Sequence, residues 1–177
     1  QHLLDLWACQ PDFPIITVIH SGAVTFNDHN ASNIRCVREF IEPRTLQQLL
    51  NEHRFHMCLS ETEGWGHYIP EAMSMQNIVI TLDAPPMHEH VQPERGVLLG
   101  CQQLGRQHFA SLYQANDEAL VEWMHQWQKN EGHSDFEAMG RKAREFFLKQ
   151  RNEFSARLGS LIDQTLGLGQ DAQIPSH

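Results

Sequence analysis

Glu63 and Glu71 are the residues of this sequence whose type and spacing best suit chemistry on a polar ligand. They lie eight residues apart, and Gly64 and Gly66 stand between them. Glycine lets the backbone turn sharply and approach a ligand closely, while carboxylates accept paired hydrogen bonds from vicinal hydroxyls such as those of sugars and ribose. The segment therefore predicts a site for a hydroxyl-rich ligand. An acidic loop that only caps a helix has the same spacing, so the pair by itself leaves both interpretations open.

The elements that would position these carboxylates are a strand before them and a helix after them. The apolar run His56–Leu59 ends just before the acidic turn, and Gly66–Met73 has a helical pattern. The free N–H groups at the start of such a helix favour an anionic or strongly polar group. Pro70 falls early in the helix, where its missing N–H costs least. We expect Glu63 on the turn and Glu71 about one and a half turns into the helix, both facing one crevice.

Five short apolar runs predict the strands of a sheet. Most are apolar at consecutive positions, which is typical of strands covered on both faces. Helical patterns lie between several of the runs, and this alternation predicts a Rossmann-like, doubly wound parallel α/β sheet. Ligands of such sheets bind outside the carboxyl ends of the strands. The runs are Ile15–His20, Ile34–Val37, His56–Leu59, Ile78–Leu82 and Gly96–Leu99.

Capping boxes and apolar periodicity indicate the helices. Thr45–Gln48 and Ser134–Glu137 are capping boxes that would each begin a helix. A further helix is expected after Asn116–Asp117. The longest helix is predicted over 135–166, and two glycines within it would each weaken it by about 1 kcal/mol relative to alanine.

Length and charge restrict the classes of function. A chain of 177 residues indicates one domain, which we place at 1–166, and we expect 167–177 to be a disordered tail. The 22 acidic and 13 basic residues give a net charge of −9 with neutral histidine, which argues against binding to nucleic acid or to an anionic membrane. No apolar run reaches the roughly 20 residues needed to span a bilayer. The chain begins with Gln1 rather than Met, so we expect a cut or processed N-terminus.

Cysteine and histidine do not show recognisable metal-binding spacing. The four cysteines are scattered, and three lie in or beside apolar runs, which favours core thiols and a reducing, cytoplasmic setting. Among the 12 histidines, His53 and His56 and also His88 and His90 are closely spaced, but neither pair has a third and fourth ligand. We therefore expect no metal.

The segment from Ser60 to Val91 resembles the signature of retaining glycosyltransferases of family 4, which have the two-domain GT-B architecture. The family pattern is an E-x7-E motif written E-G-(F/W)-G-x-x-x-x-E-A, then a small apolar strand, then a D-x-P-P-M-x-E loop. A looser match extends from the helix expected at Leu3–Trp7 to the long C-terminal helix. The matching positions are Glu63, Gly64, Trp65, Gly66, Glu71, Ala72, Asp83, Pro85, Pro86, Met87 and Glu89.

The resemblance implies a glycosyltransferase domain that binds a nucleotide-sugar donor, UDP- or GDP-linked, for retaining transfer to a saccharide or lipid acceptor. It implies that Glu71 holds the ribose hydroxyls and that Glu63 sits by the donor sugar and is needed for transfer. The Asp83–Glu89 loop either contacts the donor or only shapes the cleft wall. The family requires no metal or cofactor. The other donor-binding residues that the resemblance implies are Gly64, Trp65, Gly66 and His67 on the turn and Ile41 near the base.

The start of the sequence departs from the family pattern. A family member carries a strand and a Gly-Arg…Lys-Gly loop before its first C-domain helix, and Leu3–Trp7 already resembles that helix. We therefore expect the first strand, this diphosphate clamp and the N-terminal acceptor-binding domain to be missing, and the chain alone to be inactive. An exposed sheet edge would favour a homodimer. The arginines that remain to replace the clamp are Arg35, Arg38, Arg44 and Arg95.

Other functions stay open at this point. The chain is alternatively a non-catalytic nucleotide-sugar-binding fragment, half of a GT-B-like epimerase, or a plain α/β scaffold that makes protein contacts through its acidic surface. Mutation of Glu71 separates nucleotide-sugar binding from a scaffold function, because it should abolish ribose recognition and leave protein contacts through the acidic surface untouched. As a full-length enzyme the protein is expected in the cytoplasm, peripheral to the inner membrane.

Overall fold

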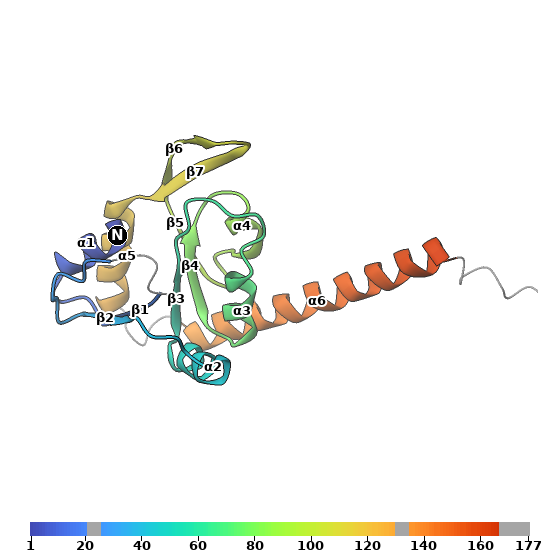
Figure 1. Ribbon diagram of the computed structural model, residues 1–177, viewed down its shortest axis with the longest axis horizontal. Helices are drawn as coiled ribbons and strands as arrows, with labels where there is room; N and C mark the ends of the chain where they lie inside the picture. The colour runs from blue at the N-terminus through green and yellow to red at the C-terminus, as the bar shows by residue number, and fades with distance from the viewer. Residues whose placement is uncertain (21–25, 130–134, 167–177) are drawn as a thin grey trace, which may run out of the picture.

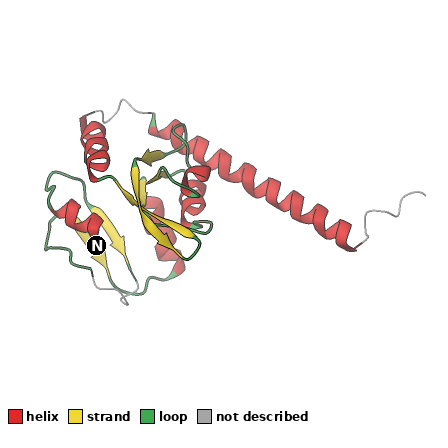
Figure 2. Ribbon diagram, turned by 90° about the horizontal axis from the view of Figure 1, so that it is seen from above, coloured by secondary structure: helices red, strands yellow, loops and turns green. Residues whose placement is uncertain are grey.

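The computed structural model describes residues 1–20, 26–129 and 135–166, which form an α/β fold with a long C-terminal helix (Figure 1). The described strands form two parallel sheets and one antiparallel hairpin, seen from above in Figure 2. In chain order the elements are α1 (His2–Ala8), β1 (Ile16–Ile19), β2 (Ile34–Val37), α2 (Pro43–Glu52), β3 (Phe55–Cys58), α3 (Tyr68–Ser74), β4 (Ile78–Leu82), α4 (Met87–His90), β5 (Val97–Leu99), β6 (Cys101–Gln107), β7 (Ala110–Ala115), α5 (Asp117–Lys129) and α6 (Phe136–Leu166).

The central sheet consists of β3, β4 and β5, which run parallel in that spatial order. Ile80 in the middle of β4 pairs with Met57 of β3 and with Val97 of β5. The strands β1 and β2 form a second parallel pair that begins with Ile16 opposite Ile34. Within the described residues no strand pairing joins the two sheets. The α/β class with parallel strands is confirmed, whereas the expected continuous sheet is divided between β1 and β3.

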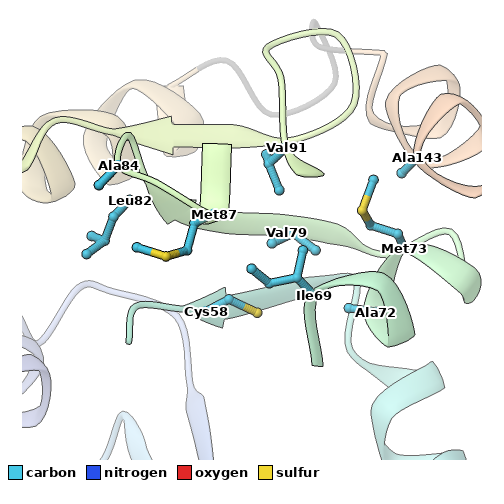
Figure 3. Packing of buried hydrophobic residues seen from close by; sticks show 10 residues of the cluster. All are labelled: Cys58, Ile69, Ala72, Met73, Val79, Leu82, Ala84, Met87, Val91 and Ala143. Atoms are coloured by element: carbon cyan, nitrogen blue, oxygen red, sulfur yellow. The ribbon is translucent and has the colours of Figure 1, made fainter. Parts of the chain in front are cut away.

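Helices cover both faces of β4, all five residues of which are buried. On one face Val79 belongs to a cluster with Met73 of α3 and Ala143 of α6 (Figure 3). On the other face Ile80 belongs to a cluster with Trp7 of α1 and Leu120 of α5. Two apolar environments, one on each side, explain why this strand is apolar at consecutive positions.

Two elements differ from the sequence expectation because their patterns are weak. The hairpin of β6 and β7 was not expected, since β6 has a largely polar sequence and exposed side chains. The hairpin follows β5 and projects beyond it (Figure 1). The one-turn helix α4 was also not expected, because four residues are too few to show helical periodicity.

The capping box at Thr45 was placed wrongly, whereas the box at Ser134 begins outside the described residues. Helix α2 begins at Pro43 with Glu42 as its N-cap residue, so Thr45 lies inside the helix. Proline at the first helical position sets this start, because its fixed φ suits a helix and its missing N–H costs nothing there. At α6 the N–H of Ala138 donates to Asp135 Oδ1 at 2.8 Å, so Asp135 caps the helix. Ser134 and the expected tail at 167–177 lie outside the described residues.

The cysteines are less buried than expected. Cys58 is buried, Cys36 and Cys101 are half-buried, and Cys9 is exposed; all four are free thiols. A core role therefore applies fully to Cys58 alone. Within the described ranges, no helix combines the length and the apolar character that crossing a membrane requires.

The long helix α6 packs against the core only through its first turns and then extends away from the rest of the chain (Figure 1). Gly140 lies where the helix crosses the end of α3: a Cβ there would stand 2.2 Å from the carbonyl oxygen of Gln76. Arg144 fixes the same crossing by donating to the carbonyl of Ser74 at 2.8 Å. Gly159, further along α6, has no atom within 4 Å of a Cβ position.

This contrast predicts opposite effects for two identical substitutions on one helix. Gly140→Ala should lower the free energy of unfolding by about 1–3 kcal/mol, because the new methyl group collides with backbone. Gly159→Ala should raise it by roughly 0.5–1 kcal/mol, because alanine is the better helix former and meets no neighbour. Urea unfolding followed by circular dichroism measures both, and a Gly140→Ala protein as stable as the parent would contradict the close crossing.

Candidate functional site

The acidic turn connects the carboxyl end of β3 to α3. Gly66 has a φ of +70°, in the left-handed region that favours glycine, and its carbonyl accepts the N–H of Ile69 at 2.9 Å. This bond closes the turn into the helix. Glu63 is half-buried, whereas Trp65 is 55% exposed. The space beside Gly64 is open, because a Cβ there would meet no atom within 4 Å.

Glu63 lies beside two groups that stay protonated at neutral pH. Burial, and to a smaller extent the charge of Glu63, raises the pKa of the Cys58 thiol to about 12. Burial also raises the pKa of the Tyr68 hydroxyl; its hydrogen bond to Ser60 Oγ at 2.8 Å opposes this shift, and Glu63 adds to it. Neither group supplies an anionic nucleophile at neutral pH, so Glu63 is the charged member of this cluster.

Glu71 lies in the first turn of α3 rather than one and a half turns into the helix, because α3 begins at Tyr68. Its exposed side chain lines a cavity of about 670 Å³. Tyr68 lines the same cavity, whereas Glu63 does not. The structure thus places Glu71 at the cavity and Glu63 on the turn outside its lining, with Tyr68 adjoining both.

The cavity lies between the two parallel sheets. Ile15 together with β1, and the residues of β3, line the cavity. Helices close the remaining sides, with Trp7 from α1, Trp127 from α5 and Leu50 from α2 among the lining residues. Within the described part of the chain, β1 pairs only with β2 and β3 only with β4, so each strand has one unpaired edge.

The loop between β4 and β5 packs against the acidic turn. Ala84 and Met87 are buried in the core, which supports a role of this loop in shaping the cleft wall. Asp83 is exposed and lies 3.1 Å from Nδ1 of His88. His90, only 7% exposed, donates from Nε2 to the carbonyl of Trp65 at 3.0 Å, because a carbonyl can only accept.

The remaining residues expected at the site, His67 and Ile41, do not line the cavity. His67 is the exposed N-cap residue of α3, and its carbonyl accepts the N–H of Glu71 at 3.0 Å. Its imidazole has no hydrogen-bond partner among the described residues. Ile41 is half-buried just ahead of α2 and does not line the cavity.

The candidate arginines differ in how far they are engaged. Arg35 and Arg44 are exposed on β2 and α2, and Arg38 forms an ion pair with Asp28 at 3.4 Å. Arg95 is largely buried: its side chain is 13% exposed and lies over the ring of Phe146. Arg95 is therefore committed to packing.

Sequence reasoning missed Ser60, Tyr68 and His90 as parts of the site. Tyr68 offered one signal, since it stands between the two glutamates at the start of the expected helix. His90 offered none beyond its place after the D-x-P-P-M-x-E loop, because its contact with Trp65 spans 25 residues. The hairpin also reaches the turn, where the N–H of Tyr113 donates to the carbonyl of Glu61 at 2.8 Å.

Comparison with known proteins adds no relative to this picture. No family model matches the chain, and no curated protein is significantly similar to it. Among the residues that the structure describes, no three or more His, Cys, Asp or Glu side chains gather as a metal site would require. The geometry of the acidic turn therefore carries the functional argument.

The two glycines of the turn yield a prediction about its backbone. Gly66→Ala should lower the free energy of unfolding by roughly 1–2 kcal/mol, because the left-handed region is unfavourable for a residue with a Cβ. Gly64→Ala is the matched control: it has no positive φ and open space, so its effect should stay within about 0.5 kcal/mol. Equal effects of the two substitutions in urea unfolding would refute the assigned turn geometry.

Proposed function

We propose that the chain is the donor-binding domain of a retaining glycosyltransferase and that it binds a nucleotide sugar along the segment from Ser60 to Val91. In this proposal Glu71 accepts hydrogen bonds from the ribose hydroxyls. Glu63 lies by the transferred sugar and is needed for transfer. The N–H groups of the turn from Gly64 to His67 meet the sugar and the diphosphate. A separate domain holds the saccharide or lipid acceptor.

The observation that supports this proposal most is the position of the two signature segments at neighbouring strand ends. The E-x7-E segment follows β3, the Asp83–Glu89 segment follows β4, and these strands are adjacent and parallel. The carboxyl ends of adjacent parallel strands lie at one edge of a sheet, which is where ligands of open α/β sheets bind. The hydrogen bond from His90 to Trp65 joins the two segments directly.

We also propose that the two parallel sheets are parts of one Rossmann-like GT-B sheet, with one further strand between β1 and β3. The unpaired edges of β1 and β3 along the cavity support this. One strand presents N–H and C=O groups on both of its edges, so it could pair with β1 on one side and with β3 on the other. The helices around the cavity would cover both faces of that strand, as they cover β4. The resulting order is β2, β1, the further strand, β3, β4 and β5.

A non-catalytic nucleotide-sugar-binding fragment is the second candidate, and the state of the arginines favours it. Arg95 donates to the carbonyl of His90 at 2.8 Å and packs on Phe146, and Arg38 is paired with Asp28. Stabilisation of the leaving diphosphate is worth a few kcal/mol per donor. A site in which no cation is held beside the diphosphate would bind a donor but transfer its sugar poorly.

Calorimetric titration with UDP, GDP and ADP tests the proposed donor site. The wild-type chain should bind one of the three saturably. Glu71→Gln should weaken that binding by roughly tenfold or more, because charge-assisted hydrogen bonds to the ribose contribute about 1.5–3 kcal/mol. Glu145→Gln, on the exposed surface of α6, is the control and should bind as the wild type does. Binding to none of the three, or unchanged binding by Glu71→Gln, would refute the site.

The open strand edges lead to a prediction about association. The isolated chain should sediment as a species larger than its 20.4 kDa mass, because unpaired edges next to apolar surface favour self-association. Ile15→Lys, at the exposed residue just before β1, should shift the equilibrium towards monomer. Phe109→Lys, at the 98% exposed tip of the hairpin, should leave it unchanged. A wild-type chain that sediments only as a monomer would contradict this expectation.

A further inference from the structure

His90 is a buried polar residue whose side chain contacts the acidic turn. It ends the one-turn helix α4, between the buried Met87 and Val91, and is only 7% exposed. Its Nε2–H donates to the carbonyl of Trp65 at 3.0 Å. Its ring also meets the Trp65 ring edge to face, with centroids 4.7 Å apart and an interplanar angle of 82°. One side chain thus holds both the backbone and the ring of Trp65.

The backbone of His90 is itself fixed to the core. Its carbonyl accepts Nε of Arg95 at 2.8 Å, and the Arg95 guanidinium lies 4.1 Å from the centre of the Phe146 ring on α6. Gly96, just beyond, packs so closely that a Cβ would stand 2.6 Å from Val91. The imidazole therefore projects from a rigid support towards a turn that is exposed at Trp65.

The planarity of the peptide bond converts this contact into an orientation of the turn. The peptide between Trp65 and Gly66 is trans, so its C=O and N–H point in opposite directions. Because the carbonyl faces the buried His90, the N–H of Gly66 faces away from it. This N–H has no acceptor among the described residues. The left-handed φ of Gly66 lets the chain continue into α3 from that orientation.

We propose that His90 is a positioning residue that holds the Trp65–Gly66 peptide so that the N–H of Gly66 donates to a phosphate or sugar oxygen of the bound ligand. This inference rests on the proposed function for the identity of the ligand. The orientation of the peptide follows from the contacts of His90 alone. The loop after β4 thereby acts on the ligand through the turn after β3, without touching the ligand itself.

Three substitutions separate the hydrogen bond from the packing. His90→Gln keeps an amide donor at the distance of Nε2, His90→Phe keeps the ring against Trp65 without a donor, and His90→Leu removes both. In ¹H–¹⁵N spectra of the unliganded full chain, the Gly66 cross-peak should shift in His90→Phe and His90→Leu and stay near its wild-type position in His90→Gln. With the nucleotide that binds the wild type, the affinity of His90→Phe should fall roughly tenfold, as the loss of one charge-assisted hydrogen bond predicts, and His90→Gln should recover most of it.

The outcomes distinguish this inference from the proposed function. A Gly66 signal that is the same in all four proteins overturns the role of His90, even if nucleotide binds. If UDP, GDP and ADP all fail to bind the wild type, the proposed donor site fails, while the spectra of the unliganded proteins still decide whether His90 sets the peptide. Equal loss of affinity in His90→Gln and His90→Phe also overturns it, because packing rather than the donor would then be responsible.

Discussion

Complete burial of β4 is the constraint on which the rest of the structure depends. A strand whose five residues are all buried needs neighbours on both edges and cover on both faces. The strands β3 and β5 supply the edges, and α3, α4 and α6 on one side and α1 and α5 on the other supply the cover. Because β4 cannot move without opening both clusters, the ends of β3 and β4 are fixed relative to each other. The two polar segments that follow β3 and β4 therefore also begin at fixed positions relative to each other.

The acidic turn is positioned by packing from below rather than by its own sequence. Gly64 meets no neighbour and does not restrain the turn, and Trp65 is 55% exposed and is itself held by His90. The restraints come from Ile69, which is fully buried in the core, from the hydrogen bond of His90, and from the N–H of Tyr113, which donates to the carbonyl of Glu61. A turn held at these three points, with open space beside Gly64, combines a defined backbone with access for a ligand. Preorganised N–H donors of this kind lose little entropy when a ligand binds.

The sequence was sufficient for elements whose residues carry a strong local pattern, and insufficient where distant contacts decide. All five expected strands are present, because a continuous apolar run implies burial whatever lies beside it. The pairing of a strand depends on its neighbouring strands, which the run itself does not specify. The division of the sheet between β1 and β3 was therefore not foreseen. The polar hairpin lacks an apolar alternation that would predict it, and it is attached through distant contacts, such as the packing of Cys101 and Tyr113 against the core and the hydrogen bond from the N–H of Tyr113 to the carbonyl of Glu61. At α2 one proline outweighed the capping box at Thr45. The same limit applies to the site: the two glutamates stand out in sequence, whereas His90 acts across 25 residues.

The charges around the turn constrain which residues could contact each part of a bound nucleotide sugar. Glu63, Glu71 and Asp83 are acidic, so this edge of the sheet repels the phosphates while it attracts hydroxyl donors. In the proposed function the diphosphate would then rely on backbone N–H groups, such as that of Gly66, and on a cation. Arg95 cannot serve without leaving Phe146 and the carbonyl of His90. The proposed strand between β1 and β3 would end at the same edge of the sheet as β3, next to the acidic turn. A cation just beyond that strand would supply the positive charge that the diphosphate needs. The same added strand would then both complete the sheet and bring the cation to the diphosphate.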